Sequence, residues 1–174
     1  ERLGPVAKLL TRAQATGRCH VYGEGMRATP FPPAGAALSA DIAIHAHLYA
    51  STAGIEAALA GIPTLFLDRE GWNVGRFYTN GLEGKVVFKD WASLWEALTI
   101  HWKNETDYPE LGDLSSQLNE LDSFRDGKAA ERVGTYLHWL IQGSEQGLDR
   151  DTILADAAER YVKQWGYDKI TSIG

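Results

Sequence analysis

The residues most able to do chemistry lie in one short stretch that ends at Asp68. Ser51 and Thr52 offer hydroxyl and backbone N–H groups at the predicted start of a helix, where the positive end of the helix dipole favours anions. Gly54 lets backbone approach a ligand closely. Glu56 stands one position too late for a capping box that begins at Thr52, so we interpret its carboxylate as an acceptor for ligand hydroxyl groups. The alternative, that Ser51 or Thr52 only caps the helix, stays open.

Two further groups of residues flank this stretch. Gly23 and Gly25 belong to a predicted turn in which backbone could approach a ligand, although it lacks a G-x-G-x-x-G pattern and a plain turn is the alternative. Arg69 and Arg76 lie in a glycine-punctuated segment, residues 68–84, that also contains aromatic residues. Arginine beside an aromatic ring would suit a phosphate and a flat base, whereas solvated arginines are the alternative.

Two histidines raise the possibility of a metal site. His45 and His47 stand one residue apart at the end of a predicted strand, so their side chains share a face. Two ligands are too few for zinc, and neither Cys19 nor a nearby carboxylate completes the set, so we predict no metal. We interpret His47 as a ligand contact or as a partner in a loop hydrogen bond.

The elements that must position these residues alternate between strand and helix. We predict strands over residues 19–22, 41–44 and 85–88, and helices over residues 5–16, 36–40 and 91–104. Between them, residues 51–68 are predicted to form a loop, a short helix, a turn and a buried strand. This alternation predicts an α/β fold with a parallel sheet covered on both faces. Ligands of such sheets bind beyond the carboxyl ends of the strands, where residues 23–27, 45–52 and 68–72 would meet.

The remainder of the chain is predicted to be helical. Residues 127–142 and 150–165 each place apolar side chains on one face, and Asp126 is a plausible N-cap of the first. We therefore expect a donor-site sheet domain over residues 1–104. A helical extension over residues 105–174 would pack on that domain or on a missing amino-terminal half.

Composition limits the possible functions. The 174 residues carry a net charge of −6 without a basic stripe, which argues against binding of nucleic acid. A single cysteine excludes an internal disulfide. No apolar run approaches the roughly 18 residues of a membrane span, and the first residues show no secretory pattern, so we expect a cytoplasmic protein. Because the chain starts without Met, we expect it to be a fragment of a longer one.

The order of residues 41–44 and 51–63 is similar to the carboxy-terminal half of glycosyltransferases with the GT-B fold, the half that holds the nucleotide-sugar donor. Residues 123–134 resemble the late segment of bacterial surface-polysaccharide transferases. The resemblance covers about residues 5–140 and implies a Rossmann-like domain. An extended form of the family pattern has a Glu where this chain has Tyr49, so the two-glutamate version is absent.

The resemblance implies a role for each matching residue. Ser51 and Thr52 would bind phosphate, Gly54 would allow close approach of the backbone, and Glu56 would bind the ribose. The turn that contains Gly23 and Gly25 would lie near the base, with His47 as a further donor contact. Arg69 or Arg76 could stabilise the leaving phosphate without a metal, so the only small molecule expected is the nucleotide-sugar substrate itself.

The resemblance also limits what this chain does. In this fold the general base usually comes from the amino-terminal half, so the chain should bind donor and transfer nothing alone. The implied partners are a nucleotide-sugar, a glycan or lipid-linked glycan acceptor and the missing domain, with peripheral association at the inner membrane left open. Two alternatives remain, namely a nucleotide-sugar epimerase of the same fold and a non-catalytic interaction module.

Overall fold

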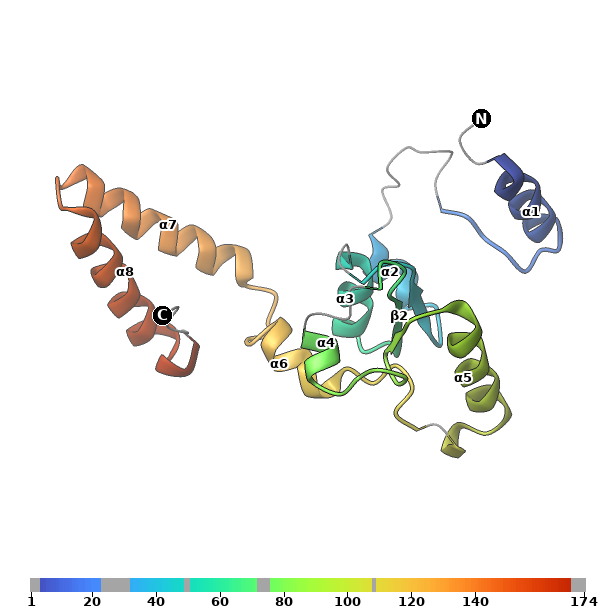
Figure 1. The fold of residues 1–174 in the computed structure, drawn as a ribbon. Coiled ribbons are helices and arrows are strands. Elements are labelled where there is room, and N and C mark those ends of the chain that lie inside the picture. The colour runs from blue at the N-terminus through green and yellow to red at the C-terminus, as the bar shows by residue number, and fades with distance from the viewer. Residues whose placement is uncertain (1–3, 23–31, 49–50, 72–75, 108, 170–174) are drawn as a thin grey trace. The chain divides into compact units, whose positions relative to one another are not determined.

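The chain contains two compact units, shown in a computed structural model that describes residues 4–22, 32–48, 51–71, 76–107 and 109–169 (Figure 1). Unit 1 is Glu1–Leu114 and unit 2 is Ser115–Gly174. Unit 1 contains a small parallel sheet with helices, and the described part of unit 2 is helical. The protein is therefore of mixed α/β class.

Three parallel strands form the sheet in the order β1-β2-β3. They are β1 (Ala43–His45), β2 (Thr64–Leu67) and β3 (Val87–Phe88). Ile44 lies opposite Leu65, and Phe66 lies opposite Val87. β2 is the central strand, and its first three residues are fully buried, as expected for a parallel strand covered on both faces. The prediction of a parallel sheet is confirmed.

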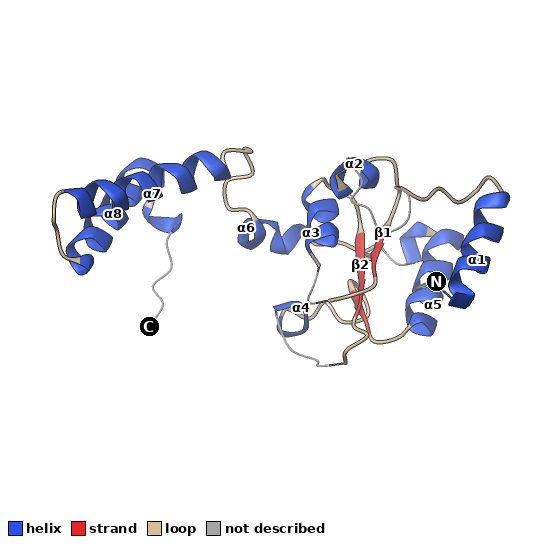
Figure 2. Ribbon diagram, turned by 90° about the horizontal axis from the view of Figure 1, so that it is seen from above, coloured by secondary structure: helices blue, strands red, loops and turns tan. Residues whose placement is uncertain are grey.

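Helices cover both faces of this sheet (Figure 2). α3 (Thr52–Leu59) lies on one face and α5 (Trp91–Lys103) on the other. Phe66 belongs to the core cluster on the α3 side, whereas Leu65 belongs to the cluster on the α5 side. Successive residues of β2 thus enter opposite cores, because side chains alternate along a strand. The other helices of unit 1 are α1 (Gly4–Ala15), α2 (Pro33–Ala37), α4 (Arg76–Thr79) and the short 3-10 helix η1 (Glu105–Asp107).

The predicted strand over residues 19–22 is wrong. These residues are described and belong to neither strand nor helix. The rings of His20 and Tyr22 make an edge contact at 4.6 Å, and both side chains are exposed. Strand propensity reflects packing on a pleated, half-buried surface, and none of the described strands pairs with this segment. The short helix predicted over residues 36–40 instead begins at Pro33, since proline suits the first helical position.

The start of α5 agrees with the sequence, but its buried face differs in part. The Asp90 carboxylate accepts a hydrogen bond from the Ser93 N–H at 2.8 Å, as a capping residue should. The helical spacing of Leu94, Trp95, Leu98 and Trp102 predicts that they share one buried face. Leu94 is fully buried, whereas Trp95 is 50% exposed.

The same helix exposes a second tryptophan that was expected to be buried. Leu98 and Ala97 lie against the sheet, and the small Ala97 side chain lets α5 sit close to it. Trp102 is 60% exposed and meets the ring of Trp95 edge-on at 5.6 Å. The inward stripe of α5 therefore consists of leucine and alanine, while the large rings flank it.

Unit 2 contains a helical hairpin. Its elements are η2 (Ser115–Gln117), α6 (Leu118–Leu121), α7 (Ala129–Glu145), α8 (Arg150–Trp165) and η3 (Tyr167–Lys169). α7 and α8 agree with the predicted helices over residues 127–142 and 150–165. Asp126 is not the N-cap of α7: that position is Lys128, and the Asp126 carboxylate instead accepts hydrogen bonds from the Arg132 guanidinium.

The boundary between the two units follows Leu114, ten residues after the expected boundary at residue 104. Leu111 and Leu114 each join one of the two cores of unit 1, and the Gly112 carbonyl accepts a hydrogen bond from the Thr64 N–H. Residues 109–114 therefore complete the sheet domain. Among the helices that the structure describes, none is both long and apolar enough to span a membrane.

Candidate functional site

The loops that follow β1 and β2 meet at the carboxyl edge of the sheet. The Nδ1 atom of His47, just after β1, lies 3.0 Å from the Oε1 atom of Glu70, just after β2. Two of the three loops expected to converge therefore do so, since parallel strands end at a common edge. The third, residues 23–27, lies outside the described residues, and with it Gly23 and Gly25.

The start of α3 follows β1 at this edge. Ser51 occupies the N-cap position, and its side chain makes no capping hydrogen bond. Its carbonyl accepts the helical hydrogen bond from the Ile55 N–H at 2.9 Å. Thr52, the first helical residue, is exposed. The hydroxyl of Ser51 is therefore not used for capping, which removes one of the structural explanations of this residue.

Glu56 lies on the exposed side of α3. The helix buries Gly54, Ala57 and Ala58, whereas Thr52 and Glu56 are exposed. Residues four apart lie one turn from each other on the same side of a helix. A ligand lying along this side, with its anionic group at the helix start, would have the Glu56 carboxylate within one helical turn.

Gly54 has a structural explanation that the sequence did not show. A Cβ atom on this residue would lie 2.5 Å from Cε1 of Phe66 and 3.1 Å from Cβ of His45. Real Cβ atoms do not approach so closely, so only glycine lets α3 pack on the strands at this point. Its implied role in close approach of a ligand remains a prediction.

Asp68 is a site residue that sequence reasoning did not identify. Its side chain is 1% exposed, and its carboxylate accepts hydrogen bonds from the Tyr78 hydroxyl at 2.7 Å and from the Gly71 N–H at 3.0 Å. A buried carboxylate needs such partners. Because the Asp68 carboxylate accepts the Gly71 N–H, it holds the turn that carries Arg69 and Glu70, and the Tyr78 hydroxyl ties the same carboxylate to α4. The only signal in the sequence was an acidic residue directly after a buried strand.

The two histidines take part in local hydrogen bonds. Nδ1 of His45 lies 2.7 Å from the carbonyl oxygen of His47. Because a carbonyl only accepts, this short contact favours a proton on Nδ1, and the 3.3 Å approach of the His47 N–H to the same atom is the weaker contact. Across the residues with described positions, no three His, Cys, Asp or Glu side chains are grouped as metal ligands would be.

The pairing of His47 with Glu70 determines what this edge can do chemically. His47 is 48% exposed and Glu70 is 28% exposed at the side chain, so solvent and ligands reach the pair. The carboxylate orients the imidazole and compensates its charge when it is protonated. An imidazole held in this way can bind an anion in its protonated form or accept a proton in its neutral form. Glu70 was not identified from the sequence.

The structure describes the side chain of Arg69 but not that of Arg76. Arg69 is exposed in the turn that Asp68 organises. Arg76 is the first residue of α4, and its side chain lies outside the described set. The backbone thus places Arg69 directly before Glu70, while the position of the Arg76 guanidinium remains untested.

A separate hollow lies where α5 meets β3. It has a volume of about 420 Å³, and its polar lining includes Lys89, Asp90 and Glu96. Lys89 also forms an ion pair with Glu83, another lining residue. None of the residues predicted to bind the donor lines this hollow.

Comparison of the chain with protein-family models, with curated proteins and with solved structures gave no match.

Proposed function

We propose that this chain is the donor-binding part of a bacterial glycosyltransferase, which moves a sugar from a nucleotide-sugar to a polysaccharide or glycolipid acceptor. The observation that carries the proposal is the contact between His47 and Glu70. It joins the loops after two parallel strands, at the edge where α3 begins and where the Ser51 side chain makes no capping hydrogen bond. Open α/β sheets bind their ligands at such an edge.

In the proposed mode, the donor phosphates lie at the start of α3. The backbone N–H groups of the first turn, the helix dipole and the hydroxyl groups of Ser51 and Thr52 favour negative charge there. His47, oriented by its contact with Glu70, is a further proposed contact of the donor. The ribose lies along the exposed side of α3, where Glu56 accepts its hydroxyl hydrogen bonds.

Sugar transfer breaks the bond between the anomeric carbon and a phosphate oxygen. The departing phosphate gains negative charge, which a fixed positive charge stabilises most when it is already in place. Arg69 and Arg76 are the residues proposed for this role. The base that deprotonates the acceptor hydroxyl would come from another part of the complete enzyme, which makes this chain a donor-binding part.

Calorimetric titration of the 174-residue chain with the monophosphates and diphosphates of cytidine, uridine and guanosine tests the proposal. We expect one of these nucleotides to bind, and its nucleotide-sugar to bind as well. Circular dichroism on the same sample shows whether the chain is folded. A folded chain that binds none of them at millimolar concentration would refute a nucleotide-sugar function.

The alternative is a nucleotide-sugar epimerase of the same fold, and one observation favours it. Epimerisation requires a group that removes a proton from a sugar carbon, and the Glu70 carboxylate next to His47 is an accessible pair of that kind. Incubation with the nucleotide-sugar in D₂O separates the two functions. Deuterium at a sugar carbon, seen by NMR, indicates an epimerase, whereas a donor-binding part leaves every sugar C–H in place.

A further inference from the structure

Helix α1 leaves its apolar side uncovered. None of its 12 residues is buried, and Val6 and Leu9 are 56% and 60% exposed. A helix of this length is only marginally stable in water by itself, because amphipathic helices gain most of their stability by covering the apolar side. α1 therefore requires a partner surface, and the charges on and around it indicate the chemistry of that surface.

The apolar and polar residues of α1 lie on opposite sides of the helix. Residues three or four positions apart share a side, which assigns one side to the apolar residues Val6, Leu9, Leu10 and Ala13. The other side carries the polar residues Lys8, Thr11, Arg12 and Gln14. An apolar side opposite a polar side that contains Lys and Arg is typical of helices that lie in the interface between a membrane and water.

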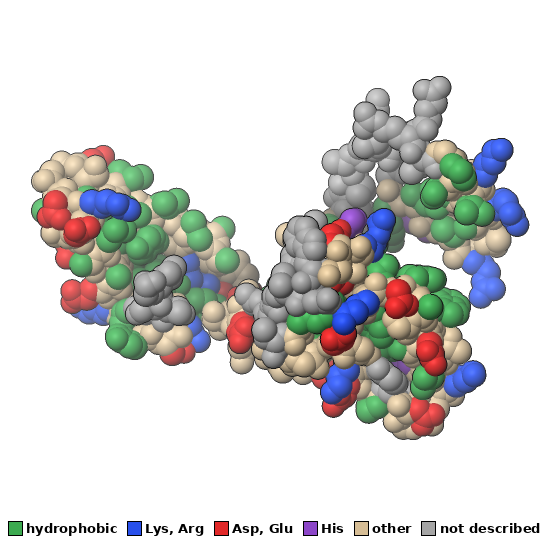
Figure 3. Space-filling view, in the orientation of Figure 1, with side chains coloured by type: hydrophobic (Ala, Val, Ile, Leu, Met, Phe, Trp, Pro, Cys, Tyr) green, Lys and Arg blue, Asp and Glu red, His purple; other side chains and the backbone are tan. Residues whose placement is uncertain are grey.

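Charge distinguishes this segment from the rest of the chain. Residues 4–23 contain the basic residues Lys8, Arg12 and Arg18 and no Asp or Glu, whereas the whole chain has a net charge of −6. Among the described residues, Lys8 and Arg12 take part in no ion pair. Figure 3 shows basic side chains projecting beside the hydrophobic ones of α1, in the orientation of Figure 1. The segment therefore presents a positive charge that an anionic surface complements.

We propose that α1 binds the surface of an anionic lipid bilayer. Its apolar side lies at the boundary between headgroups and acyl chains, and its basic side chains are long enough to reach the headgroup phosphates. The inference follows from the charge and the exposure of α1 and does not rest on the proposed function.

The acidic remainder of the chain does not prevent this binding. At physiological ionic strength the Debye length is about 8 Å, whereas a helix of 12 residues is about 18 Å long. Acidic residues held farther than a Debye length from the bilayer are largely screened, so the charges of the segment that touches the surface decide the affinity. Each Lys or Arg near an anionic bilayer raises the affinity about fivefold.

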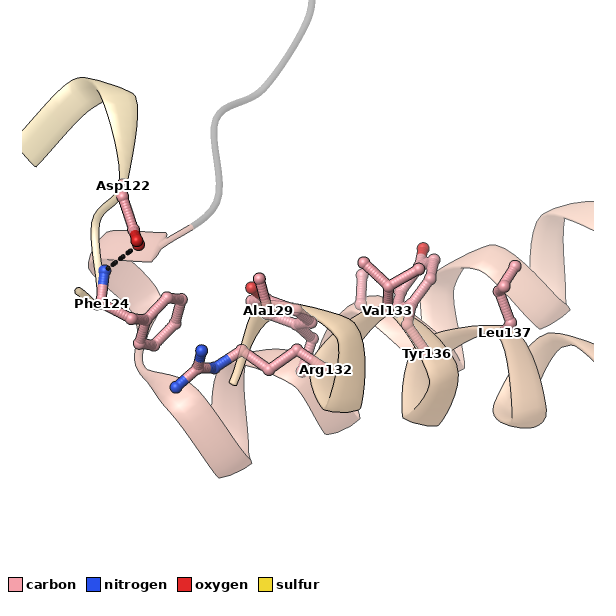
Figure 4. A pocket seen from close by; sticks show the side chains of 9 residues that line it. Asp122, Phe124, Ala129, Arg132, Val133, Tyr136 and Leu137 are labelled. Atoms are coloured by element: carbon pink, nitrogen blue, oxygen red, sulfur yellow. Dashed lines mark hydrogen bonds between the residues drawn. The ribbon is translucent and has the colours of Figure 1, made fainter. Parts of the chain in front are cut away.

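An apolar groove in unit 2 lacks such a charge (Figure 4). It has a volume of about 410 Å³ between α7 and α8, and Arg132 is the basic residue that lines it. The Arg132 guanidinium lies 3.5 Å from the centroid of the Phe124 ring and donates hydrogen bonds to the Asp126 carboxylate, which compensates its charge. Unit 2 contains ten acidic and seven basic residues. An anionic surface therefore favours α1 over this groove.

Co-sedimentation of the 174-residue chain with lipid vesicles tests the proposal. We expect binding to phosphatidylcholine vesicles that contain about one third phosphatidylglycerol, and little binding to phosphatidylcholine alone, because only the former are anionic. Raising the salt concentration to about 0.5 M should weaken the binding, since it shortens the Debye length. Circular dichroism of the same samples shows that the chain is folded.

A double substitution tests the role of charge. The variant with Lys8→Gln and Arg12→Gln should bind anionic vesicles at least about fivefold more weakly than the wild type. Glutamine is a good helix former, so α1 should persist in this variant. The matched control carries Lys103→Gln and Lys163→Gln, which change the net charge equally at exposed positions outside α1, and it should bind as the wild type does.

A single substitution tests the apolar side of α1. Leu9→Gln should also weaken binding at least about fivefold, because the leucine side chain no longer leaves water. Leu38→Gln is the control, since that leucine is 67% exposed and follows α2, and it should leave binding unchanged.

Two results overturn the proposal. One is a folded chain that does not bind anionic vesicles, or that binds phosphatidylcholine alone equally well. The other is equal losses of binding in the α1 variants and in their controls, which would mean that α1 is not the segment that binds the bilayer.

Discussion

Gly54 and Phe66 are in closer contact than any other residue type at position 54 would permit. A Cβ on Gly54 would lie 2.5 Å from Cε1 of Phe66, a fully buried ring in the central strand. The ring of Phe66 also stacks on Phe77 at 5.2 Å, so it has little room to move. This contact sets the distance between α3 and the sheet, and hence the position of the proposed phosphate site.

Gly54→Ala should therefore destabilise the protein. Overpacking of a core costs about 1–3 kcal/mol, which exceeds the gain of about 1 kcal/mol from a better helix former. Urea unfolding followed by circular dichroism measures the change in the free energy of unfolding. Gly134→Ala is the matched control, because a Cβ there meets no atom within 4 Å, and it should be stabilising.

A second substitution, at Phe66, tests whether this ring is what makes Gly54→Ala destabilising. Phe66→Leu removes the part of the ring that would clash, so Gly54→Ala should cost less in that background than in the wild type. Equal costs in both backgrounds would mean that another neighbour, such as His45, limits the space at Gly54.

Tyr78→Phe should weaken the turn that carries Arg69 and Glu70. The change removes the hydroxyl that donates to the buried Asp68 carboxylate at 2.7 Å. Hydrogen bonds to charged groups contribute about 1.5–3 kcal/mol, so a loss of this size in the free energy of unfolding is expected. Tyr167→Phe is the control, since that side chain is 78% exposed, and no measurable loss is expected there. If both variants behave alike, the Asp68 contact does not contribute to stability.

The stability of unit 2 should depend on pH through Asp126. Hydrogen bonding from the Arg132 side chain, followed by that from the Lys128 N–H, lowers the pKa of Asp126 from 3.8 to about 2. Because the folded pKa lies below the unfolded one, the ionised carboxylate stabilises the folded state. This contribution is complete above about pH 5 and is lost as the pH falls from about 4 towards 2.

Asp126→Asn removes this pH dependence. The difference in stability between wild type and variant should be constant above about pH 5 and should shrink as the pH falls from about 4 through about 2, as measured by thermal unfolding at each pH. Arg132→Lys keeps the charge without the forked geometry, so it should retain only part of the effect. A difference that persists unchanged at pH 2 would show that Asp126 acts through something other than its charge.

Glu56→Ala tests the ribose role within the proposed function. It should weaken the best-binding ribonucleotide severalfold and its 2′-deoxy analogue less, because the analogue lacks one hydroxyl that the carboxylate would accept. Calorimetry measures both affinities. Glu96→Ala removes another exposed carboxylate, from α5 of unit 1, and controls for the loss of charge. Equal losses for the two nucleotides would remove Glu56 from the ribose role.

Much of the fold was predictable because its signals are local. The apolar run through Leu65 and Phe66 marked a buried strand, Asp90 marked the start of α5, and periodic apolar residues marked α7 and α8. Each of these signals lies within a few residues of the element that it predicts. The segment over residues 19–22 shows the limit, because a strand also needs a neighbour, and no local pattern reports whether one is present.

The candidate site also combines features that are set by the local sequence with features that are set by packing. The sequence by itself determined that Ser51, Thr52 and Glu56 stand at the start of a helix after a strand, since spacing along a helix is a local property. Only the tertiary structure decided that Asp68 is buried and hydrogen-bonded to Tyr78, that Glu70 contacts His47 and that Gly54 packs against Phe66. These contacts join residues 10 to 23 positions apart, and they depend on how helices and strands pack. Packing is set by the shapes of many side chains together, which no short pattern in the sequence encodes.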